Sequence, residues 1–531
     1  MTLSRRQMLY LLPTATAFVA CAPKVASNPT LPNETVVDVR AFGAKGDGRK
    51  DDSAAIQAAV RAMRSGNTLY FPAGSYRFAQ QRPPGDAAVA ISGLSDVNIE
   101  FAPGAELLMD NLDSRTGEGT SHGILVRGPA SNITMHNVTI RWSKRAPRSF
   151  GDGIRVLGYP TGLDKPFGWV GPPAPVSRVR LSGGDIRLSP QAGAILIGVS
   201  DIAVTGLRVH GTSADGLHFN ACQRATIHDY TGIDTGDDGL ALVTYYSETP
   251  LFDDAAQTFA FPDLTEWSNA DFTISGVSVS GGRANGVRLA GANRVSLIGL
   301  KASGILKGAG LITDSASVVG PATAWRYVAS RGIRVDQMSA DNCDTGFQLL
   351  ARPSGPIDPR FTDFDVDLSG AAFRDCTNWA VRAESLTTQP ITGFRVVDCS
   401  VSATATTEGN GGFGLGNTRD IKVGTVSISQ ARPVICFSAT DSAGLQIDVM
   451  RLMITDPAKH ETARTPAAFF EDSDGTIESL EVSWPQAPST WTPIHIGSRD
   501  GDCSAPPEAL PIVIKSLTVQ PGFVMTRVGT C

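Results

Sequence analysis

Three aspartates in the middle of the chain have the residue types and the spacing to carry acid–base chemistry. Asp215 precedes Gly216, and Asp237 and Asp238 precede Gly239, which lies 23 residues further on. A Gly-apolar-x-apolar pattern recurring at this interval predicts a solenoid with one coil per repeat. Strands of neighbouring coils lie ~4.8 Å apart, which would place the three carboxylates side by side. Carboxylates that close disturb one another's pKa values, as a catalytic acid and base require.

The same aspartates also have non-catalytic interpretations. A cluster of carboxylates can hold calcium, and an acidic residue before glycine is common turn chemistry. The turn interpretation applies most strongly to Asp152, a single aspartate ahead of Gly153.

Alignment of the coils on their repeated glycines places further polar residues near the aspartates. Leu217 and Phe219 indicate that the first and third positions after each glycine point inward. The positions just before and two after the glycine are therefore expected to face solvent. Polar residues at these positions gather in the coils between Gly153 and Gly286, which predicts one patch on one face. The candidate substrate-binding residues of this region are Asp152, Arg155, His218, Arg283, Asn285 and Arg288.

Each basic residue of the patch also has a simpler interpretation. His218 could be a solvated surface histidine, and Arg155 or Arg288 could simply neutralise the aspartates.

Composition limits the class of protein and of partner. The chain has 531 residues, of which 42% are hydrophobic and 55 are glycine, as in a globular protein rich in turns. The formal net charge is −6, with no basic run beyond the N-terminus, which argues against nucleic acid as a partner.

The first 22 residues are predicted to be an export signal. Residues 4–9 resemble a twin-arginine motif, and the apolar stretch that follows is too short to stay in a bilayer. The expected location is therefore periplasmic or secreted. Residues 18–21 loosely resemble a lipoprotein cleavage box, which would place a lipid anchor at Cys21. Cleavage near Ala20 or Ala22 is the alternative.

Export would permit disulfide bonds. Cys503 and Cys531 bracket the C-terminal segment and are the expected pair. The cysteines inside the repeats are interpreted as small buried hydrophobic residues; they are Cys222, Cys343, Cys376 and Cys399.

The remainder of the chain divides into three parts. Residues 23–35 are predicted to be a disordered tether, residues 36–485 the solenoid, and residues 486–531 a C-terminal cap. A helix capped by Asp51 or Asp52 is expected to run to about Arg64. Its apolar positions share one face, so the helix can cover the open end of the solenoid.

Three long insertions interrupt the repeats, at residues 157–175, 245–270 and 314–329. The aromatic residues of the second could pave a groove over the acidic coil, or could pack into a small core of their own. Few helical patterns follow Arg64, which excludes a doubly wound α/β sheet. The predicted fold is an all-β, right-handed parallel β-helix with an N-terminal capping helix and long loop insertions.

Two segments carry a family resemblance. Gly43–Gly48, followed by Asp51-Asp52 and Ala55–Gln57, resembles the opening signature of the pectate lyase/polygalacturonase superfamily. Ala214–Gly216, followed by Gly236–Gly239, resembles glycoside hydrolase family 28. The first signature is specific for the fold, whereas the second is more specific for hydrolases.

The resemblance implies a role for each aspartate. Asp237 would be the general acid, and Asp215 and Asp238 would activate water, with inversion at the anomeric carbon. Two family motifs are missing from this chain. Asn285 occupies the column of the family's histidine, and the Arg-Ile-Lys motif that grips a uronate has only Arg288, one coil early. The sugar therefore cannot be inferred from the family.

The predicted function is an exported, inverting glycoside hydrolase acting on a polysaccharide or oligosaccharide without a cofactor. One alternative is a polysaccharide lyase, in which calcium on the aspartates acidifies a uronate near Arg155, Arg288 or His218. Another is a non-catalytic, glycan-binding β-helix. The sequence does not indicate an oligomeric state.

Overall fold

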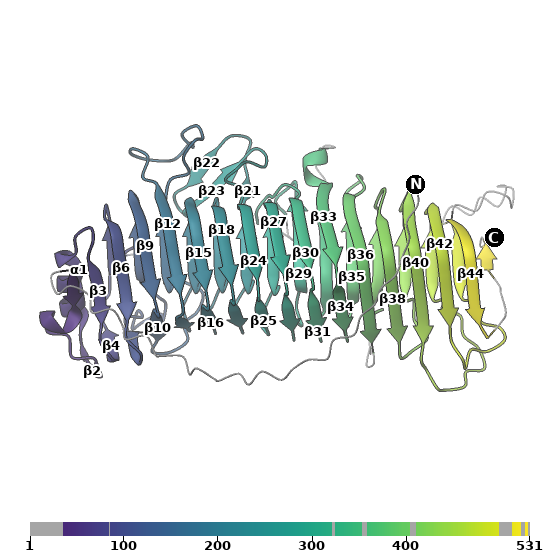
Figure 1. Cartoon of the computed structure of the whole chain (residues 1–531), viewed down its shortest axis with the longest axis horizontal. Coiled ribbons are helices and arrows are strands. Elements are labelled where there is room, and N and C mark those ends of the chain that lie inside the picture. Colours follow the sequence, from purple (N-terminus) through teal and green to yellow (C-terminus); the bar gives the residue numbers. More distant parts are fainter. Residues whose placement is uncertain are drawn as a thin grey trace, which may run out of the picture.

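The chain folds into a right-handed parallel β-helix, which confirms the predicted fold class (Figure 1). Successive coils stack along one long axis, from the purple N-terminal coils to the yellow C-terminal ones. The computed structural model describes residues 35–83, 85–320, 324–352, 358–403, 410–498, 512–521 and 526–528. The predicted export signal, the predicted tether except residue 35, and Cys21, Cys503 and Cys531 lie outside these residues.

The coils contribute strands to three faces of the solenoid, which we call face 1, face 2 and face 3. The strands within each face are parallel to one another. Face 1 consists of β1 (Val36–Asp38), β3 (Thr68–Phe71), β6 (Ser95–Phe101), β9 (Ala130–His136), β12 (Val176–Ser182), β15 (Val199–Thr205), β18 (Gln223–His228), β24 (Ala270–Ser275), β27 (Asn293–Ile298), β30 (Arg331–Asp336), β33 (Asp363–Ser369), β36 (Thr392–Ala403), β38 (Lys422–Gln430), β40 (Leu445–Ile454), β42 (Gly475–Ser483) and β44 (Ile512–Gln520).

Face 2 consists of shorter strands and ends where β36 and the long strands after it span both faces. Its members are β2 (Asp47–Asp51), β4 (Gly74–Phe78), β7 (Ala105–Met109), β10 (Thr139–Trp142), β13 (Asp185–Arg187), β16 (Arg208–His210), β19 (Thr231–Ile233), β25 (Ser278–Ser280), β28 (Lys301–Ser303), β31 (Ser339–Asp341) and β34 (Ala371–Arg374).

Face 3 carries the aspartates and follows the repeated glycines. Its strands are β5 (Ala87–Ser92), β8 (His122–Arg127), β11 (Ile154–Leu157), β14 (Ala194–Ile197), β17 (Leu217–Asn220), β20 (Leu240–Val243), β26 (Val287–Ala290), β29 (Ala309–Ala316), β32 (Thr345–Arg352), β35 (Trp379–Ser385), β37 (Gly412–Gly416), β39 (Phe437–Thr440), β41 (Ala468–Glu471), β43 (Ile494–Gly497) and β45 (Thr526–Val528).

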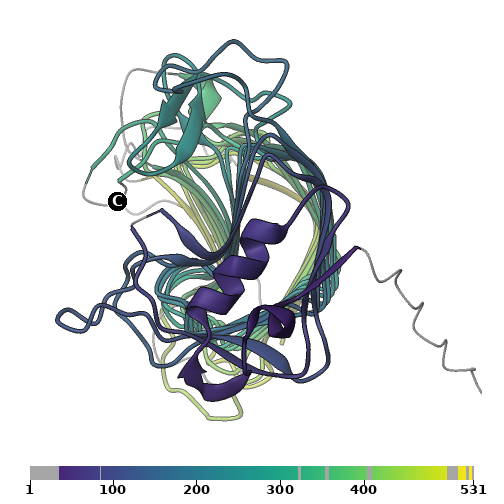
Figure 2. The same ribbon diagram turned by 90° about the vertical axis from the view of Figure 1, so that its left-hand side faces the viewer.

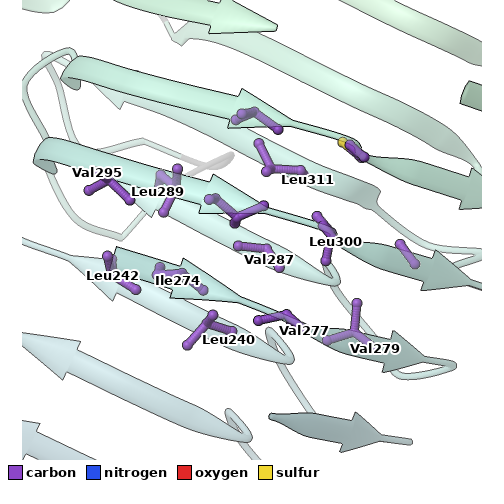
Figure 3. Close-up of a cluster of buried hydrophobic side chains, with 14 of the residues drawn as sticks. Leu240, Leu242, Ile274, Val277, Val279, Val287, Leu289, Val295, Leu300 and Leu311 are labelled. Atoms are coloured by element: carbon purple, nitrogen blue, oxygen red, sulfur yellow. The ribbon is translucent and has the colours of Figure 1, made fainter. Parts of the chain in front are cut away.

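The register on face 3 is the one that the 23-residue interval predicts. Leu217 pairs with Ala194 on the preceding coil and with Leu240 on the following one. Leu240 then pairs with Val287, 47 residues on, because the second insertion lies between them. Side chains such as Leu240 and Val287 point into one continuous apolar core between the faces (Figure 3). Burial of this ladder of aliphatic side chains is the main favourable contribution to folding.

A short helix covers the N-terminal end of this core. Helix α1 (Ser53–Ala62) lies across the opening of the first coils (Figure 2), after a 3-10 turn, η1 (Val39–Phe42). Ile56, Ala59 and Met63 are buried against the core, as the apolar pattern predicts. The side chain of Asp51 accepts a hydrogen bond from the amide of Ser53. Asp52 instead holds the preceding loop, by accepting from the amides of Lys45 and Gly46.

The repeated glycines mark the point of closest approach between coils. A methyl group on Gly153 would lie 2.5 Å from the carbonyl oxygen of Gly193, and one on Gly239 would lie 2.6 Å from that of Gly286. Carbon and oxygen atoms cannot approach to that distance unless the backbone shifts, so these coils favour glycine at this position. We call this series of glycines the glycine column; it comprises Gly123, Gly153, Gly193, Gly216, Gly239, Gly286, Gly310 and Gly346.

The second insertion forms a lobe beside face 3. It contains a small sheet of β21 (Tyr245–Tyr246), β22 (Leu251–Asp253) and β23 (Thr258–Phe261). Most of its aromatic side chains, together with Trp169 of the first insertion, pack into a satellite core against face 3. Of the two alternatives for these aromatic residues, packing into a small core is confirmed for Phe252, Phe259, Phe261 and Trp267, which are buried.

The solenoid continues beyond residue 485, into the segment that was predicted to be a cap. Strand β44 pairs with β42, and β45 pairs with β43, so this segment extends faces 1 and 3. The cysteines predicted to be buried thiols are buried and unpaired. A second 3-10 turn, η2 (Pro359–Phe361), leads into β33. Among the residues that the structure describes, no helix has the length and apolarity needed to cross a membrane.

Replacement of a glycine in the column should destabilise the fold. Gly239→Ala places a methyl group against the carbonyl of Gly286 and the side chain of Val279, and overpacking of this kind lowers stability by about 1–3 kcal/mol. Gly320→Ala is the matched control, because its added methyl group meets no atom within 4 Å. Urea denaturation measures both; an unchanged midpoint for Gly239→Ala would contradict the packing constraint.

Candidate active site

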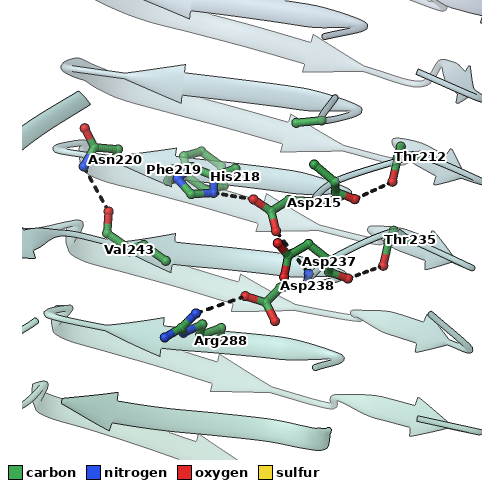
Figure 4. A network of polar contacts seen from close by, with 12 residues as sticks. Thr212, Asp215, His218, Phe219, Asn220, Thr235, Asp237, Asp238, Val243 and Arg288 are labelled. Atoms are coloured by element: carbon green, nitrogen blue, oxygen red, sulfur yellow. Dashed lines mark hydrogen bonds and ion pairs between the residues drawn. The ribbon is translucent and has the colours of Figure 1, made fainter. Parts of the chain in front are cut away.

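The three aspartates meet at the start of β17 and β20 on face 3, as their spacing predicts (Figure 4). One carboxylate oxygen from each of Asp215, Asp237 and Asp238 lies within 4.8 Å of the other two. The side chain of Asp238 is 4% exposed, that of Asp215 14% and that of Asp237 32%. We call these three residues the aspartate cluster.

Asp215 is held by two hydrogen bonds, one at each carboxylate oxygen. Its Oδ2 lies 2.8 Å from Nδ1 of His218, and its Oδ1 accepts from the amide of Asp238 at 3.1 Å. The carboxylate partner favours the tautomer of His218 that carries its proton on Nδ1. Nε2 of His218 is buried and has no hydrogen-bond partner among the described residues. In that tautomer Nε2 carries a free lone pair.

Asp238 repeats the bond of Asp215 one coil further on. Its Oδ1 accepts from the amide of Asn285 at 3.1 Å and from the side-chain amide of Asn285 at 2.8 Å. Oδ1 of Asn285 in turn accepts from the amide of Ala309 at 2.9 Å. The side chain before the glycine thus accepts from a backbone amide of the next coil in five coils, at His122, Asp152, Asp215, Asp238 and Asn285. We call this series the pre-glycine ladder.

Asp237 is turned away from this ladder. Its Oδ2 accepts from Nη1 of Arg148 at 2.7 Å. Arg148 lies 89 residues earlier, in the turn between β10 and β11. The ion pair therefore spans the surface beside the cluster and ties this turn to the coil that carries Asp237.

The environment disturbs the pKa values of the cluster. Burial is the main cause that raises the pKa of Asp238 to about 7; the charges of Asp215 and Asp237 add to it, and Arg288 at 3.9 Å opposes it. Burial and the charge of Asp215 also raise the pKa of Asp237, against the effect of Arg148. A pKa near the working pH is what a proton-transferring carboxyl group needs.

A second buried polar group lies two coils towards the N-terminus. Asp152 is fully buried and contacts His122 at 3.1 Å and Arg155 at 2.8 Å. Burial alone would raise its pKa, but hydrogen bonds and charge from His122 and Arg155 outweigh burial and lower it to about 2. Asp152 also accepts from the amide of Ala192, so it belongs to the pre-glycine ladder.

A cavity of about 590 Å³ joins the two groups. Its floor includes Asp152, Arg155, Asp215 and His218. One wall comes from the turn that carries Arg148, and the opposite wall comes from the second and third insertions, which contribute Tyr245, residues 254–258 and Trp325. Clefts of this size, lined by a few converging polar groups, are typical of small-molecule and sugar sites.

The expectation that the polar columns face solvent is wrong. Asp152, Arg155, His218 and Asp238 are all at most 8% exposed, because the turn before β11 and the insertions overhang face 3. Three predicted substrate-binding residues, Arg283, Asn285 and Arg288, do not line the cavity. Of these, Arg283 is exposed.

Arg288 does not line the cavity either, because its guanidinium is engaged with a buried acid. It binds the buried Asp314 through two hydrogen bonds, of 3.0 and 2.7 Å, and lies over the ring of Tyr327. Asn285 contacts the cluster through Asp238 and does not line the cavity.

Sequence reasoning missed several residues that shape the site. Arg148 and Trp325 lie in irregular segments outside the repeat register, so no spacing argument reaches them. Arg127 lines the cavity at the end of β8. His122 is visible in the column before Gly123, but it lies one coil before the coils between Gly153 and Gly286 in which the predicted patch falls. In the structure it contacts Asp152 at 3.1 Å.

The donor set of the aspartate cluster resembles a calcium site in one respect. Carboxylate oxygens are the ligands that calcium prefers, and three lie close together. However, the guanidinium of Arg148 already occupies Asp237, and Asn285 donates to Asp238. A calcium ion beside the positively charged guanidinium of Arg148 would be repelled. The residues present therefore do not fit a bound calcium ion.

The N-terminal segment matches a known family. Residues 36–86 match the model described as rhamnogalacturonase A/epimerase, pectate lyase-like. This match confirms the predicted relationship to the pectate lyase-like superfamily.

Curated relatives match over part of this chain. Mannuronan C5-epimerase AlgE3 of Azotobacter vinelandii is 39% identical over 130 residues, which is 24% of this chain and 7% of the relative. The chain spans only 7–13% of the length of the first three curated relatives that it matches.

Two solved structures resemble the fold. The A-module of mannuronan C-5 epimerase AlgE6 from the same organism has a TM-score of 0.44 and 15% identity, covering 82% of this chain and 98% of the module. A family 28 exopolygalacturonase of Yersinia enterocolitica has a TM-score of 0.37 and 14% identity, covering 92% of this chain and 78% of that chain.

Removal of the charge at Asp238 should stabilise the protein at neutral and alkaline pH. An unfolded aspartate ionises near pH ~4, whereas folded Asp238 does so at about 7. Between these two pH values the folded state binds more protons than the unfolded state. The free energy of unfolding therefore falls as pH rises from about 4 to about 7. Asp238→Asn should raise the free energy of unfolding at pH 8 by on the order of 1–4 kcal/mol, with no gain below pH 4.

Asp152→Asn is the matched control for this measurement. The pKa of Asp152 is lowered to about 2, so its contribution is lost as pH falls below about 4 and is present at pH 8. This variant should lose stability at pH 8. Chemical denaturation across pH measures both variants, and a less stable Asp238→Asn at pH 8 would contradict the assignment.

Proposed function

We propose that this protein is a glycoside hydrolase that cleaves a polysaccharide or oligosaccharide at the aspartate cluster. The observation that carries the proposal is the pair of carboxyl groups with raised pKa, Asp237 and Asp238, beside Asp215 at the end of a polar cavity. Cleavage of a glycosidic bond needs one carboxyl group that is protonated and one acceptor on the same site. Export to the periplasm or beyond remains part of the proposal, with Cys21 as the candidate lipid anchor.

Asp237 is the proposed general acid. It is the most exposed member of the cluster, and its outward position lets it reach the oxygen of the leaving sugar. Both Asp215 and Asp238 are held by the pre-glycine ladder. Their fixed oxygens are suited to orient the water that attacks the anomeric carbon, with His218 hydrogen-bonded behind Asp215.

The stereochemical course depends on where that water enters. The family resemblance implies inversion, for which the two carboxyl groups are typically about 6.5–9.5 Å apart. The carboxyl groups of a retaining pair are typically roughly 5–5.5 Å apart. The anomeric configuration of the first product, read by proton NMR, distinguishes the two.

A second candidate function is proton abstraction at C5 of a uronan, leading to epimerisation or elimination. Two observations favour it: the curated relatives include mannuronan C5-epimerases, and Arg127, Arg148 and Arg155 line the cavity. Guanidinium groups can neutralise a uronate carboxylate. His218 lines the same cavity, and its Nε2 has no hydrogen-bond partner among the described residues. This nitrogen is the candidate base that would take the C5 proton.

Replacement of the proposed acid should remove nearly all turnover. Asp237→Asn keeps the shape but cannot donate a proton, so we expect a loss of roughly 10²–10⁴-fold in kcat with the fold retained. Asp185→Asn is the matched control, because Asp185 also pairs with an arginine, Arg187, but lies on β13 of face 2, away from the aspartate cluster on face 3. Release of reducing ends measures both; full activity of Asp237→Asn would overturn the assignment.

The products distinguish hydrolysis from the second candidate. Hydrolysis should release new reducing ends without ultraviolet absorbance, whereas elimination gives an unsaturated, absorbing sugar. Epimerisation would exchange the C5 proton with deuterium from heavy water without shortening the chain. We expect reducing ends alone, from a screen of neutral and acidic polysaccharides. Tight binding with no product in any assay would support the non-catalytic alternative.

A further inference from the structure

The cavity is asymmetric about the aspartate cluster. On face 3 its lining comes from β8, β11, β14 and β17, which carry Arg127, Arg155, Ile195 and His218. Among the residues that the structure describes, β20 and the face 3 strands after it contribute nothing to the lining. The cluster therefore lies at the C-terminal end of the cavity.

Contacts from both sides close this C-terminal end. Tyr245 of the second insertion packs against Trp325 of the third, with 4.6 Å between ring centroids. From the opposite wall, Arg148 reaches across to Asp237 at 2.7 Å. An aromatic pair and an ion pair thus cover the surface along which a polymer would have to continue past Asp215.

The other end of the cavity leads onward. A hollow of about 370 Å³ shares Gly85 and Arg127 with the cavity and reaches Ser92 on β5. Another, of about 210 Å³, shares Arg127, Asp254 and Gln257 with it. Arg127 therefore lies where three hollows meet, and the continuous path runs from the cluster towards the N-terminal coils.

We propose that the cavity takes the end of a glycan chain, with its terminal sugars against Asp215 and the rest of the chain lying over β5 towards the N-terminal coils. The inference rests on the proposed function. A chain bound in this way is cut near its end, because the closed side leaves no room for a long continuation. The enzyme releases one short product of constant length.

The time course of products on a cleavable polysaccharide tests this mode of action. The wild-type enzyme should release one short oligosaccharide or a monosaccharide from the first minutes. Viscosity should fall slowly relative to the rise in reducing ends. A ladder of intermediate lengths at early times, with a rapid loss of viscosity, would overturn the proposal.

Opening the closed end should change this pattern. The double variant Tyr245→Ala, Trp325→Ala removes the aromatic pair, so longer products should appear early and the viscosity should fall faster per bond cut. Phe167→Ala is the matched control. It removes an aromatic ring that is 77% exposed on the first insertion, outside the cavity lining, and should keep the wild-type products.

The proposed function and the chain-end mode fail in different ways. If Asp237→Asn has no effect on product release, the proposed function fails and the inference falls with it. If cleavage depends on Asp237 but yields internal fragments from the start, only the chain-end mode fails. Should the double variant unfold, as checked by circular dichroism, the wild-type product profile still decides.

Discussion

The glycine column brings the backbones of successive coils into contact at the start of face 3. A methyl group at Gly153 or Gly239 would overlap the carbonyl of the next coil, so these coils stack this tightly because the side chain is absent there. The residue just before each glycine is then fixed in position relative to its counterpart one coil away. This fixed spacing places the carboxylates of Asp215 and Asp238 side by side, and everything chemical about the site depends on it.

The close stacking also explains why the site is buried. One carboxylate oxygen of each aspartate in the pre-glycine ladder accepts a hydrogen bond from an amide of the next coil. The side chain therefore lies along the sheet and does not reach into solvent. Burial then raises the pKa of Asp238, whereas Asp152, in the same ladder, has a lowered pKa because His122 and Arg155 face it. Asp152 and Asp238 thus make the same hydrogen bond to the backbone of the next coil. Their side-chain neighbours nevertheless leave Asp152 ionised and Asp238 partly protonated at neutral pH.

Features that follow the repeat could be predicted from the sequence, whereas features set by the non-repeating segments could not. The interval from Gly216 to Gly239 was enough to predict the fold and the meeting of the aspartates. The exposure of the patch could not be predicted, since it is set by insertions that follow no register. Arg148 illustrates the limit: its contact with Asp237 joins residues 89 apart in sequence, and only the folded path of the turn before β11 brings them together.

Asn285 suggests how such a site could arise and disappear. In the ladder it bonds to the coil on either side, accepting from Ala309 and donating to Asp238, so an amide fills the same backbone role as a carboxylate. The backbone hydrogen bond is then kept whether this position is an acid or an amide, and a single exchange between aspartate and asparagine alters reactivity while the scaffold persists. Catalysis on such a solenoid can drift from coil to coil during evolution, or lapse into plain sugar binding, without passing through an unfolded ancestor.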